Sequence, residues 1–170
     1  MPINKIKQPS ILNVDKNIRL RKTEESEWIT ALPWYENPSV LYYSEGIEDL
    51  EKKYNLDTIK RMYKYLSENG ELYFIEFLEK DKWTSIGDVT LSENNFPIVI
   101  GDETYWGRGI GKKVIETLLL RAKNIGISKI YIPTIYKYND RSRNLFTSLG
   151  FKKVSESDKE ESFQLELDNY

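Results

Sequence analysis

The 170-residue chain contains no cysteine and no histidine. The absence of cysteine excludes disulfides and thiol nucleophiles, and the absence of both residues excludes zinc sites built from Cys and His. A Ser-His-Asp triad and an imidazole general base are excluded for the same reason. Any catalysis therefore has to rely on carboxylates, tyrosine, serine, lysine, arginine, backbone amides or water.

Long apolar runs and an excess of one charge sign are also missing. No stretch approaches the roughly 20 apolar residues needed to span a bilayer, and residues 1–16 lack the apolar core of a signal peptide. The 25 Lys and Arg residues nearly balance the 27 Asp and Glu residues. We therefore expect a cytoplasmic protein, monomeric or homodimeric, that binds no metal, no nucleic acid and no membrane.

The chain also lacks internal repeats and any linker rich in Pro, Gly or Ser. A hydrophobic content of 39% is enough for a packed core at this length. We therefore expect a single domain over residues 1–170, with residues 1–16 as a flexible N-terminal segment.

Hydrophobic periodicity predicts alternating groups of helices and strands. Residues 34–46 are interpreted as an aromatic loop broken by Pro38. The predicted helices cover about 23–33, 56–69, 111–124 and 141–148. The predicted strands cover about 18–20, 71–78, 83–91, 97–101, 129–135 and 163–167. The resulting order, βααβββαβαβ, indicates an α/β fold with a mixed, mostly antiparallel sheet flanked by helices.

A glycine-rich turn joins the strand at 97–101 to the helix that follows it. Three glycines alternate with other residues in Gly107-Arg108-Gly109-Ile110-Gly111, so the backbone can turn tightly and approach a ligand. Amides at the start of the helix attract phosphate. A Walker loop is excluded because Lys112 is followed by Lys113 instead of Ser or Thr. The turn indicates a phosphate site, with a plain strand-to-helix connection as the alternative.

Three segments together resemble the GNAT acetyltransferase superfamily. Residues 106–111 fit its pyrophosphate motif Q/R-x-x-G-x-G/A, except that Trp106 occupies the first position. Residues 138–151 resemble the family segment N-x-x-S-x-x-x-Y-x-x-x-G-F. Residues 34–40 are similar to a stretch of the branch that contains aminoglycoside and ribosomal-protein N-acetyltransferases. The resemblance implies an enzyme that transfers an acetyl group from acetyl-CoA directly to a primary amine in a ternary complex.

The resemblance also implies which residues bind the cofactor. Backbone amides of the glycine turn would hold the pyrophosphate, the strand at 98–100 would run beside the pantetheine arm, and Asn139 would hydrogen-bond that arm. Asn139 as a simple helix cap is the alternative. The implied cofactor-binding residues are Ile98, Val99, Ile100, Trp106, Gly107, Arg108, Gly109, Ile110, Gly111, Lys112, Asn139, Ser142, Arg143 and Phe146.

Two proton transfers need candidate groups. A carboxylate suits removal of the proton from an amine, and Asp102 is the first candidate, with Glu103 beside it, because both follow the strand at 97–101. An ordinary polar strand exit is the alternative for these two acids. Phe146 occupies the position of the tyrosine that protonates the leaving thiolate in the family. Tyr138, Tyr136 or water would replace it, or the thiolate would leave unaided.

The acceptor pocket is expected among the aromatic and acidic residues of the N-terminal half. Trp34, Tyr35 and Asp88 are the candidate substrate-binding residues. Aromatic walls with acids suit a small cationic amine, whereas core packing is the alternative for the aromatics. An acceptor at protein N-termini is the second hypothesis. A non-catalytic acyl-CoA-binding module is the third, and Phe146 motivates it.

Overall fold

The computed structural model describes residues 3–168 and 170. Its strands form a five-stranded sheet in the order β1-β2-β3-β4-β5 and a three-stranded sheet in the order β6-β8-β7. The strands are β1 (Ile11–Asn13), β2 (Ile18–Lys22), β3 (Glu71–Glu79), β4 (Lys82–Leu91), β5 (Ile98–Ile100), β6 (Lys129–Tyr136), β7 (Lys152–Glu156) and β8 (Glu160–Glu166). The α-helices are α1 (Leu32–Glu36), α2 (Pro38–Glu45), α3 (Leu56–Asn69), α4 (Ile110–Asn124) and α5 (Asp140–Ser148). The 3-10 helices are η1 (Ile3–Lys5), η2 (Glu25–Ala31) and η3 (Glu103–Tyr105).

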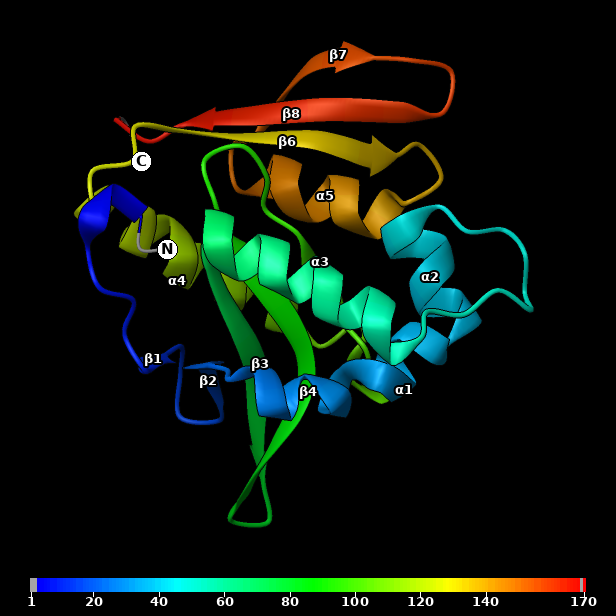
Figure 1. Ribbon diagram of the computed structural model, residues 1–170. Coiled ribbons are helices and arrows are strands. Elements are labelled where there is room, and N and C mark those ends of the chain that lie inside the picture. The colour runs from blue at the N-terminus through cyan, green and yellow to red at the C-terminus, as the bar shows by residue number, and fades with distance from the viewer. Residues whose placement is uncertain (1–2, 169) are drawn as a thin grey trace.

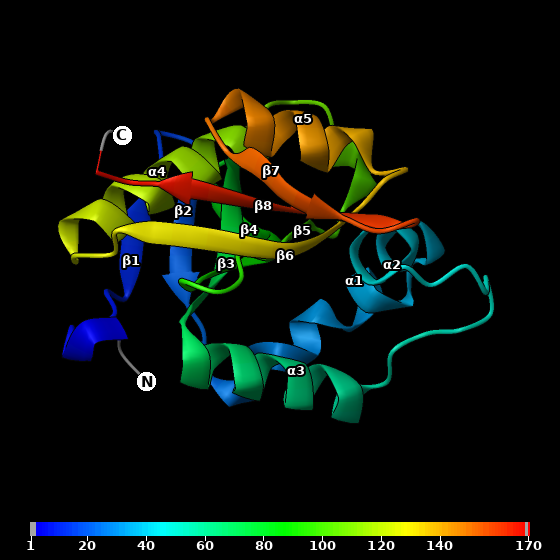
Figure 2. The same ribbon diagram turned by 90° about the horizontal axis from the view of Figure 1, so that it is seen from above.

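Helices cover both faces of the strands (Figure 1). Figure 2 shows α4 and α5 on one side and α3 on the opposite side. On α3, Ile59, Tyr63 and Leu66 recur at helical spacing and pack with Leu72 and Phe74 of β3 in one core cluster. The inward stripe of α4 packs in the other cluster. The fold therefore has a separate core on each side of the five-stranded sheet.

A close approach of β4 and β5 brings the site residues together. Asp88 of β4 pairs with Val99 of β5 in the antiparallel register. A Cβ added to the neighbouring Gly87 would lie only 2.0 Å from the backbone oxygen of Val99. A side chain at Gly87 would therefore push β5 away, so the glycine sets the distance between these strands.

The two sheets separate between β5 and β6. Within the described residues, no strand pair joins the sheets. A backbone hydrogen bond of 2.8 Å from Tyr131 N to Glu93 O links β6 to the loop between β4 and β5. The pairing of β6 with β8 is irregular between Ile132 and Ile135, where Pro133 has no N–H to donate. Two cavities lie at the divide between β5 and β6.

The predicted fold class is confirmed, and one segment was predicted wrongly. Residues 34–46 were expected to form a loop, but they belong to α1 and α2. Pro38 starts α2 instead of breaking the chain, because a proline in the first helical turn has no intrahelical hydrogen bond to lose. Asn37 caps this helix by accepting a hydrogen bond from Ser39 N at 2.9 Å. Pro33 likewise lies in the first turn of α1.

The structure adds strands to the predicted order. Ile11–Asn13, from the segment expected to be flexible, pairs with β2. Strand β7 pairs with β8, and all five of its residues are exposed, so it has no hydrophobic alternation to predict it. Every strand pair in the described part of the chain is antiparallel. Among these residues, no helix has the length and apolar character required to cross a membrane.

Candidate functional site

Two cavities meet at the divide between β5 and β6. The first has a volume of about 500 Å³ and extends along β5, the glycine turn and α5. The second has a volume of about 290 Å³ and lies among α1, α2, α3, β4, β5 and β6. Residues that line both cavities form a shared wall, which consists of Tyr43, Ser44, Ile98, Val99, Asn139 and Ser142.

The glycine turn forms one end of the first cavity. Gly107 and Gly109 both have a φ of +76°, a conformation that favours glycine, and a Cβ on either would meet no heavy atom within 4 Å. The hydrogen bond from Lys113 N to Gly109 O is 3.3 Å long, so the amides of residues 110–112 precede the helical ladder. These amides and the dipole of α4 favour an anion such as a diphosphate in the open space beside the turn.

An arginine and a tryptophan form a second feature of the first cavity. The guanidinium carbon of Arg141 lies 3.8 Å from the ring centroid of Trp106 and 4.9 Å from that of Tyr43. Trp106 Nε1 donates a hydrogen bond of 2.7 Å to Ile100 O, which fixes the ring against β5. No sequence pattern distinguishes Arg141 from the other basic residues, because only the fold brings α5 against the glycine turn.

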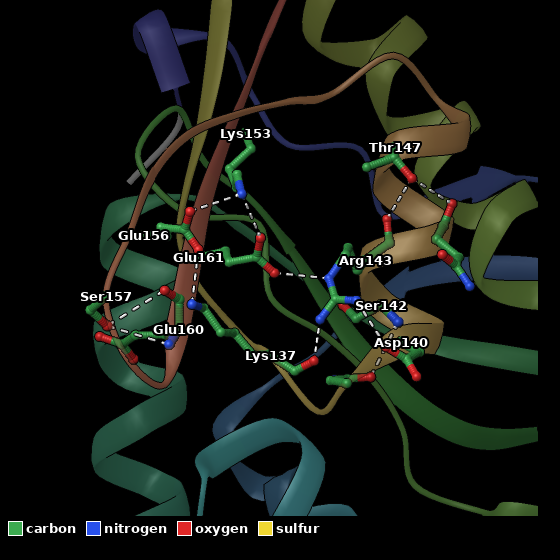
Figure 3. A network of polar contacts seen from close by, with 12 residues as sticks. Lys137, Asp140, Ser142, Arg143, Thr147, Lys153, Glu156, Ser157, Glu160 and Glu161 are labelled. Atoms are coloured by element: carbon green, nitrogen blue, oxygen red, sulfur yellow. Dashed lines mark hydrogen bonds and ion pairs between the residues drawn. The ribbon is translucent and has the colours of Figure 1, made fainter.

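Arg143, in contrast to Arg141, is held in a network of hydrogen bonds and ion pairs with other protein groups. Its Nε donates to Glu161 at 2.9 Å, its Nη1 donates to Asp140 at 2.9 Å, and its Nη2 donates to the carbonyl of Lys137 (Figure 3). Glu161 also pairs with Lys153 at 3.3 Å. This network ties α5 to β7 and β8. Arg143 lines neither cavity, in contrast to the position near the phosphates that the resemblance implied.

Asn139 lines the first cavity and also caps the N-terminus of α5. Its Oδ1 accepts a hydrogen bond of 3.2 Å from Ser142 N, which caps α5, and its Nδ2 donates to Tyr43 O at 3.3 Å. Phe146 lines only the second cavity and packs against Phe151 at a ring distance of 5.2 Å. Of the expected cofactor residues, all line the first cavity except Arg108, Arg143 and Phe146.

The three candidate catalytic residues lie outside both cavities. Asp102 caps η3 and accepts hydrogen bonds from Thr104 N at 3.0 Å and Thr104 Oγ1 at 2.7 Å. Glu103 is exposed and accepts a hydrogen bond of 3.2 Å from Asn37 Nδ2. The hydroxyl of Tyr138 donates to the carbonyl of Tyr42, and burial raises the pKa of Tyr138 to about 12.

The second cavity contains two carboxylates. Asp88 is only 1% exposed, and its Oδ2 accepts hydrogen bonds from Tyr35 at 2.8 Å and from Tyr63 at 2.7 Å. Burial raises the pKa of Asp88 to about 7, although both hydroxyls act in the lowering direction. Glu45 accepts a hydrogen bond of 2.9 Å from the hydroxyl of Tyr54, and burial raises its pKa too.

Two of the three expected substrate-binding residues line the second cavity, namely Tyr35 and Asp88. Trp34 belongs to the core instead, because a Cβ on Gly101 would lie 2.1 Å from its ring. Tyr63 was not recognised as a site residue. Its place on the buried face of α3 was the available signal, but helical spacing gives no information about what that face contacts.

Comparison with known proteins identifies the class to which this architecture belongs. Residues 31–151 match the acetyltransferase (GNAT) family. The match covers most of the chain, so the chain belongs to this family, and the predicted family is confirmed. Members of the family take the acetyl group from acetyl-CoA, and structures with this fold have been solved with that cofactor bound.

Individual relatives agree with this family. The uncharacterized protein MJ1062 of Methanocaldococcus jannaschii is 28% identical over 82% of the chain, which spans 29% of that relative's length. An N-acetyltransferase 9-like protein of Nematostella vectensis is 29% identical, with 81% of the chain and 76% of the relative covered. The crystal structure of a domain from Methanocaldococcus jannaschii has a TM-score of 0.75 at 26% identity, with 89% of the chain and 99% of the domain covered.

Proposed function

We propose that the chain is an acetyl-CoA-dependent N-acetyltransferase that acts on a small cationic amine. The observation that carries this proposal is the meeting of two cavities of opposite character at Ile98 and Val99. One cavity offers amides and cations to an anionic cofactor, and the other offers carboxylates to an ammonium group. Proximity of two bound substrates supports direct transfer, which requires no covalent intermediate and no cysteine.

The residues of the first cavity fit acetyl-CoA, which supplies an activated thioester when bound. Amides at residues 109–112 and the guanidinium of Arg141 would hold the diphosphate. Because β5 is the last strand of its sheet, its outer edge is available to the amide groups of an extended arm. Trp106 keeps its ring against β5 through Ile100 and presents Arg141 to the turn. The open space at Gly107 and Gly109 favours a bound ligand at this place.

The second cavity fits a compact amine. No lysine or arginine lines it in the described part of the chain, whereas Asp88 and Glu45 both do. Its volume of about 290 Å³ is at the small end of ligand pockets, for which about 300–1,000 Å³ is usual. An ammonium group on a short aliphatic or aromatic body would fill this space. The size favours a small molecule over an extended polypeptide terminus as the acceptor.

Calorimetric titration with acetyl-CoA tests the cofactor part of the proposal. Gly109→Trp should weaken binding by at least about 100-fold, because the substitution fills the cavity and strains a positive φ. Leu120→Trp is the matched control, since it adds the same side chain to the exposed face of α4. Equal binding by both variants, or none by the wild type, would contradict the cofactor site.

An amine screen tests the transfer. Released CoA can be followed with a thiol reagent, because the chain contains no cysteine to react with it. We expect turnover with compact primary amines such as propylamine and putrescine. Acetyl-CoA binding without turnover of any amine would favour the acyl-CoA-binding module instead, for which Phe146 in the usual tyrosine position is the motivation.

A further inference from the structure

Several carboxylates lie near the divide between the sheets, but their surroundings differ. Asp102 is held by Thr104 at the cap of η3, and Glu103 points to Asn37, so neither reaches a cavity. Asp88 and Glu45 both line the second cavity. Of these two, Asp88 belongs to the strand that borders β5. Asp88 is therefore the cavity carboxylate that lies directly opposite a β5 residue of the shared wall, Val99.

The register of the sheet places Asp88 beside the junction of the cavities. Its Cα partner across the strands is Val99, which lines both cavities. Side chains of directly opposed residues stand about 4.5–5.5 Å apart at Cβ. Gly87 keeps β4 close to β5 at this point. A group bound in the second cavity beside Val99 therefore lies next to Asp88.

Two phenols hold this carboxylate from different helices. Tyr35 of α1 and Tyr63 of α3 both donate to Oδ2, the same oxygen of Asp88. The rings of Tyr35 and Tyr63 meet edge to face at 6.3 Å, so each phenol also restricts the other. Resting on the proposed function, we propose that Asp88 accepts the proton of the incoming ammonium and that Tyr35 and Tyr63 are its positioning residues.

The Asp88 carboxylate takes one proton from R–NH₃⁺ and leaves a neutral amine. The nitrogen lone pair forms the bond to the acetyl carbonyl carbon, and the carbon–sulfur bond breaks with its electron pair on sulfur. The second proton passes from nitrogen to the thiolate, and Asp88 later releases its proton to solvent. The products are the N-acetylated amine, free CoA and one proton.

The pH dependence follows from the groups that face Asp88. These are Tyr35 from α1, Tyr63 from α3 and Glu45 from α2, and burial is the main cause of its pKa of about 7. Above this pH Asp88 is charged and can accept a proton, and below it the group is neutral. The rate should therefore fall as the pH drops through about 7, and the amine itself loses its proton above about 10.

The decisive variant is Asp88→Asn, with Asp102→Asn as the matched control. The probes are propylamine, putrescine and glycinamide, and kcat/KM is measured from about pH 5 to about pH 9, an interval that brackets the Asp88 pKa of about 7. Asp88→Asn should lower kcat/KM at neutral pH by about 100- to 10,000-fold and abolish the acidic limb. Asp102→Asn should stay within about 3-fold of the wild type, which corresponds to less than about 1 kcal/mol.

The positioning roles of Tyr35 and Tyr63 are tested by the position of the acidic limb in the pH profile of kcat/KM. Tyr35→Phe and Tyr63→Phe each remove a hydrogen bond that stabilises the charged carboxylate, so the pKa of Asp88 should rise. The acidic limb of kcat/KM should then move to higher pH in both variants. A merely structural role would lower the rate at every pH and leave the limb in place.

Each outcome supports or overturns the proposal. Wild-type activity in Asp88→Asn, or the large loss in Asp102→Asn instead, overturns the role of Asp88 and leaves the proposed function standing. Acetyl-CoA binding by the wild type without turnover of any amine overturns both. If Asp88→Asn fails to fold, which circular dichroism would reveal, the phenylalanine variants decide, and an unmoved acidic limb then overturns the proposal.

Discussion

The two cavities share a wall at β5, yet they are built in opposite ways. The first is formed largely by a continuous segment, residues 98–112, and by α5, which caps itself with Asn139. The second draws its polar groups from separate elements, among them Tyr35 of α1, Glu45 of α2 and Asp88 of β4. A continuous segment can carry its geometry locally, whereas a dispersed site exists only when the whole fold has formed.

The cavities also differ in charge. The first presents amides at the N-terminus of α4 together with Arg141 and Lys112, all of which attract anions. The second presents Asp88 and Glu45 to its contents. In the proposed function, these charges would direct an anionic cofactor and a cationic acceptor to different sides of one strand, with the reacting groups at the shared wall.

The largest effects within this comparison should come from filling one cavity at a time. Met62 lines only the second cavity and Leu145 only the first, and both side chains are half-buried. Met62→Trp should lower kcat/KM for the amine about 10- to 100-fold without changing the Kd of acetyl-CoA, because overpacking costs about 1–3 kcal/mol. Leu145→Trp should weaken acetyl-CoA binding by a similar factor.

Calorimetry with acetyl-CoA and steady-state kinetics with putrescine would measure the two effects, and each variant serves as the control for the other. The assignment of the cavities would be reversed if Met62→Trp weakened acetyl-CoA binding while Leu145→Trp left it unchanged. Equal effects of both variants on both ligands would mean that the cavities act as one site.

A smaller effect should separate the two neighbouring arginines of α5. Arg141→Ala should weaken acetyl-CoA binding about 5-fold at low salt, because it removes a cation beside the diphosphate, and the difference should shrink at high salt. Arg143→Gln should instead lower stability by about 1 kcal/mol through loss of the contact with Glu161.

The measurements are the Kd as a function of salt and the midpoint of urea unfolding for each variant. A salt-dependent loss of affinity in Arg143→Gln with none in Arg141→Ala would return the phosphate role to Arg143, as the family resemblance implied.

The smallest effect concerns a buried polar atom of β4. Thr90 follows Asp88 on the same face of β4, and its buried Oγ1 has no hydrogen-bond partner among the described residues. Thr90→Val should leave kcat/KM unchanged and stabilise the fold by up to about 1 kcal/mol, since it removes an unpaired hydroxyl. Urea unfolding would measure this gain. A loss of stability in Thr90→Val would mean that the hydroxyl has a hydrogen-bond partner. Thr90→Ser, which keeps a hydroxyl, would then retain the stability that Thr90→Val loses.

The first cavity was the more predictable of the two. The glycine turn, the strand before it and the helix after it are contiguous, so spacing and periodicity were enough to find them. The sequence pattern was less informative about residues whose roles depend on contacts between distant segments. Arg141 and Arg143 are two residues apart, and only the packing of α5 against β8 determines that Arg143 binds Glu161 while Arg141 faces the turn.

The second cavity was harder to predict, because contacts between distant segments build it. Trp34 and Tyr35 are adjacent, but one fills the core beside Gly101 and the other donates to Asp88. The segment predicted as a loop at residues 34–46 is helical, because Pro38 begins a helix. A proline can either begin a helix or break one, depending on its position in the helix. Local patterns do not distinguish these alternatives.

The sequence by itself determined the family, the α/β fold class and the position of the glycine turn, because each depends on residues close together in the chain. It also excluded thiol and imidazole chemistry through what it lacks. Only the tertiary structure decided which carboxylate enters a cavity. Burial of Asp88 between two phenols results from the packing of α1 and α3 against β4, and such long-range contacts leave no periodic trace in the sequence.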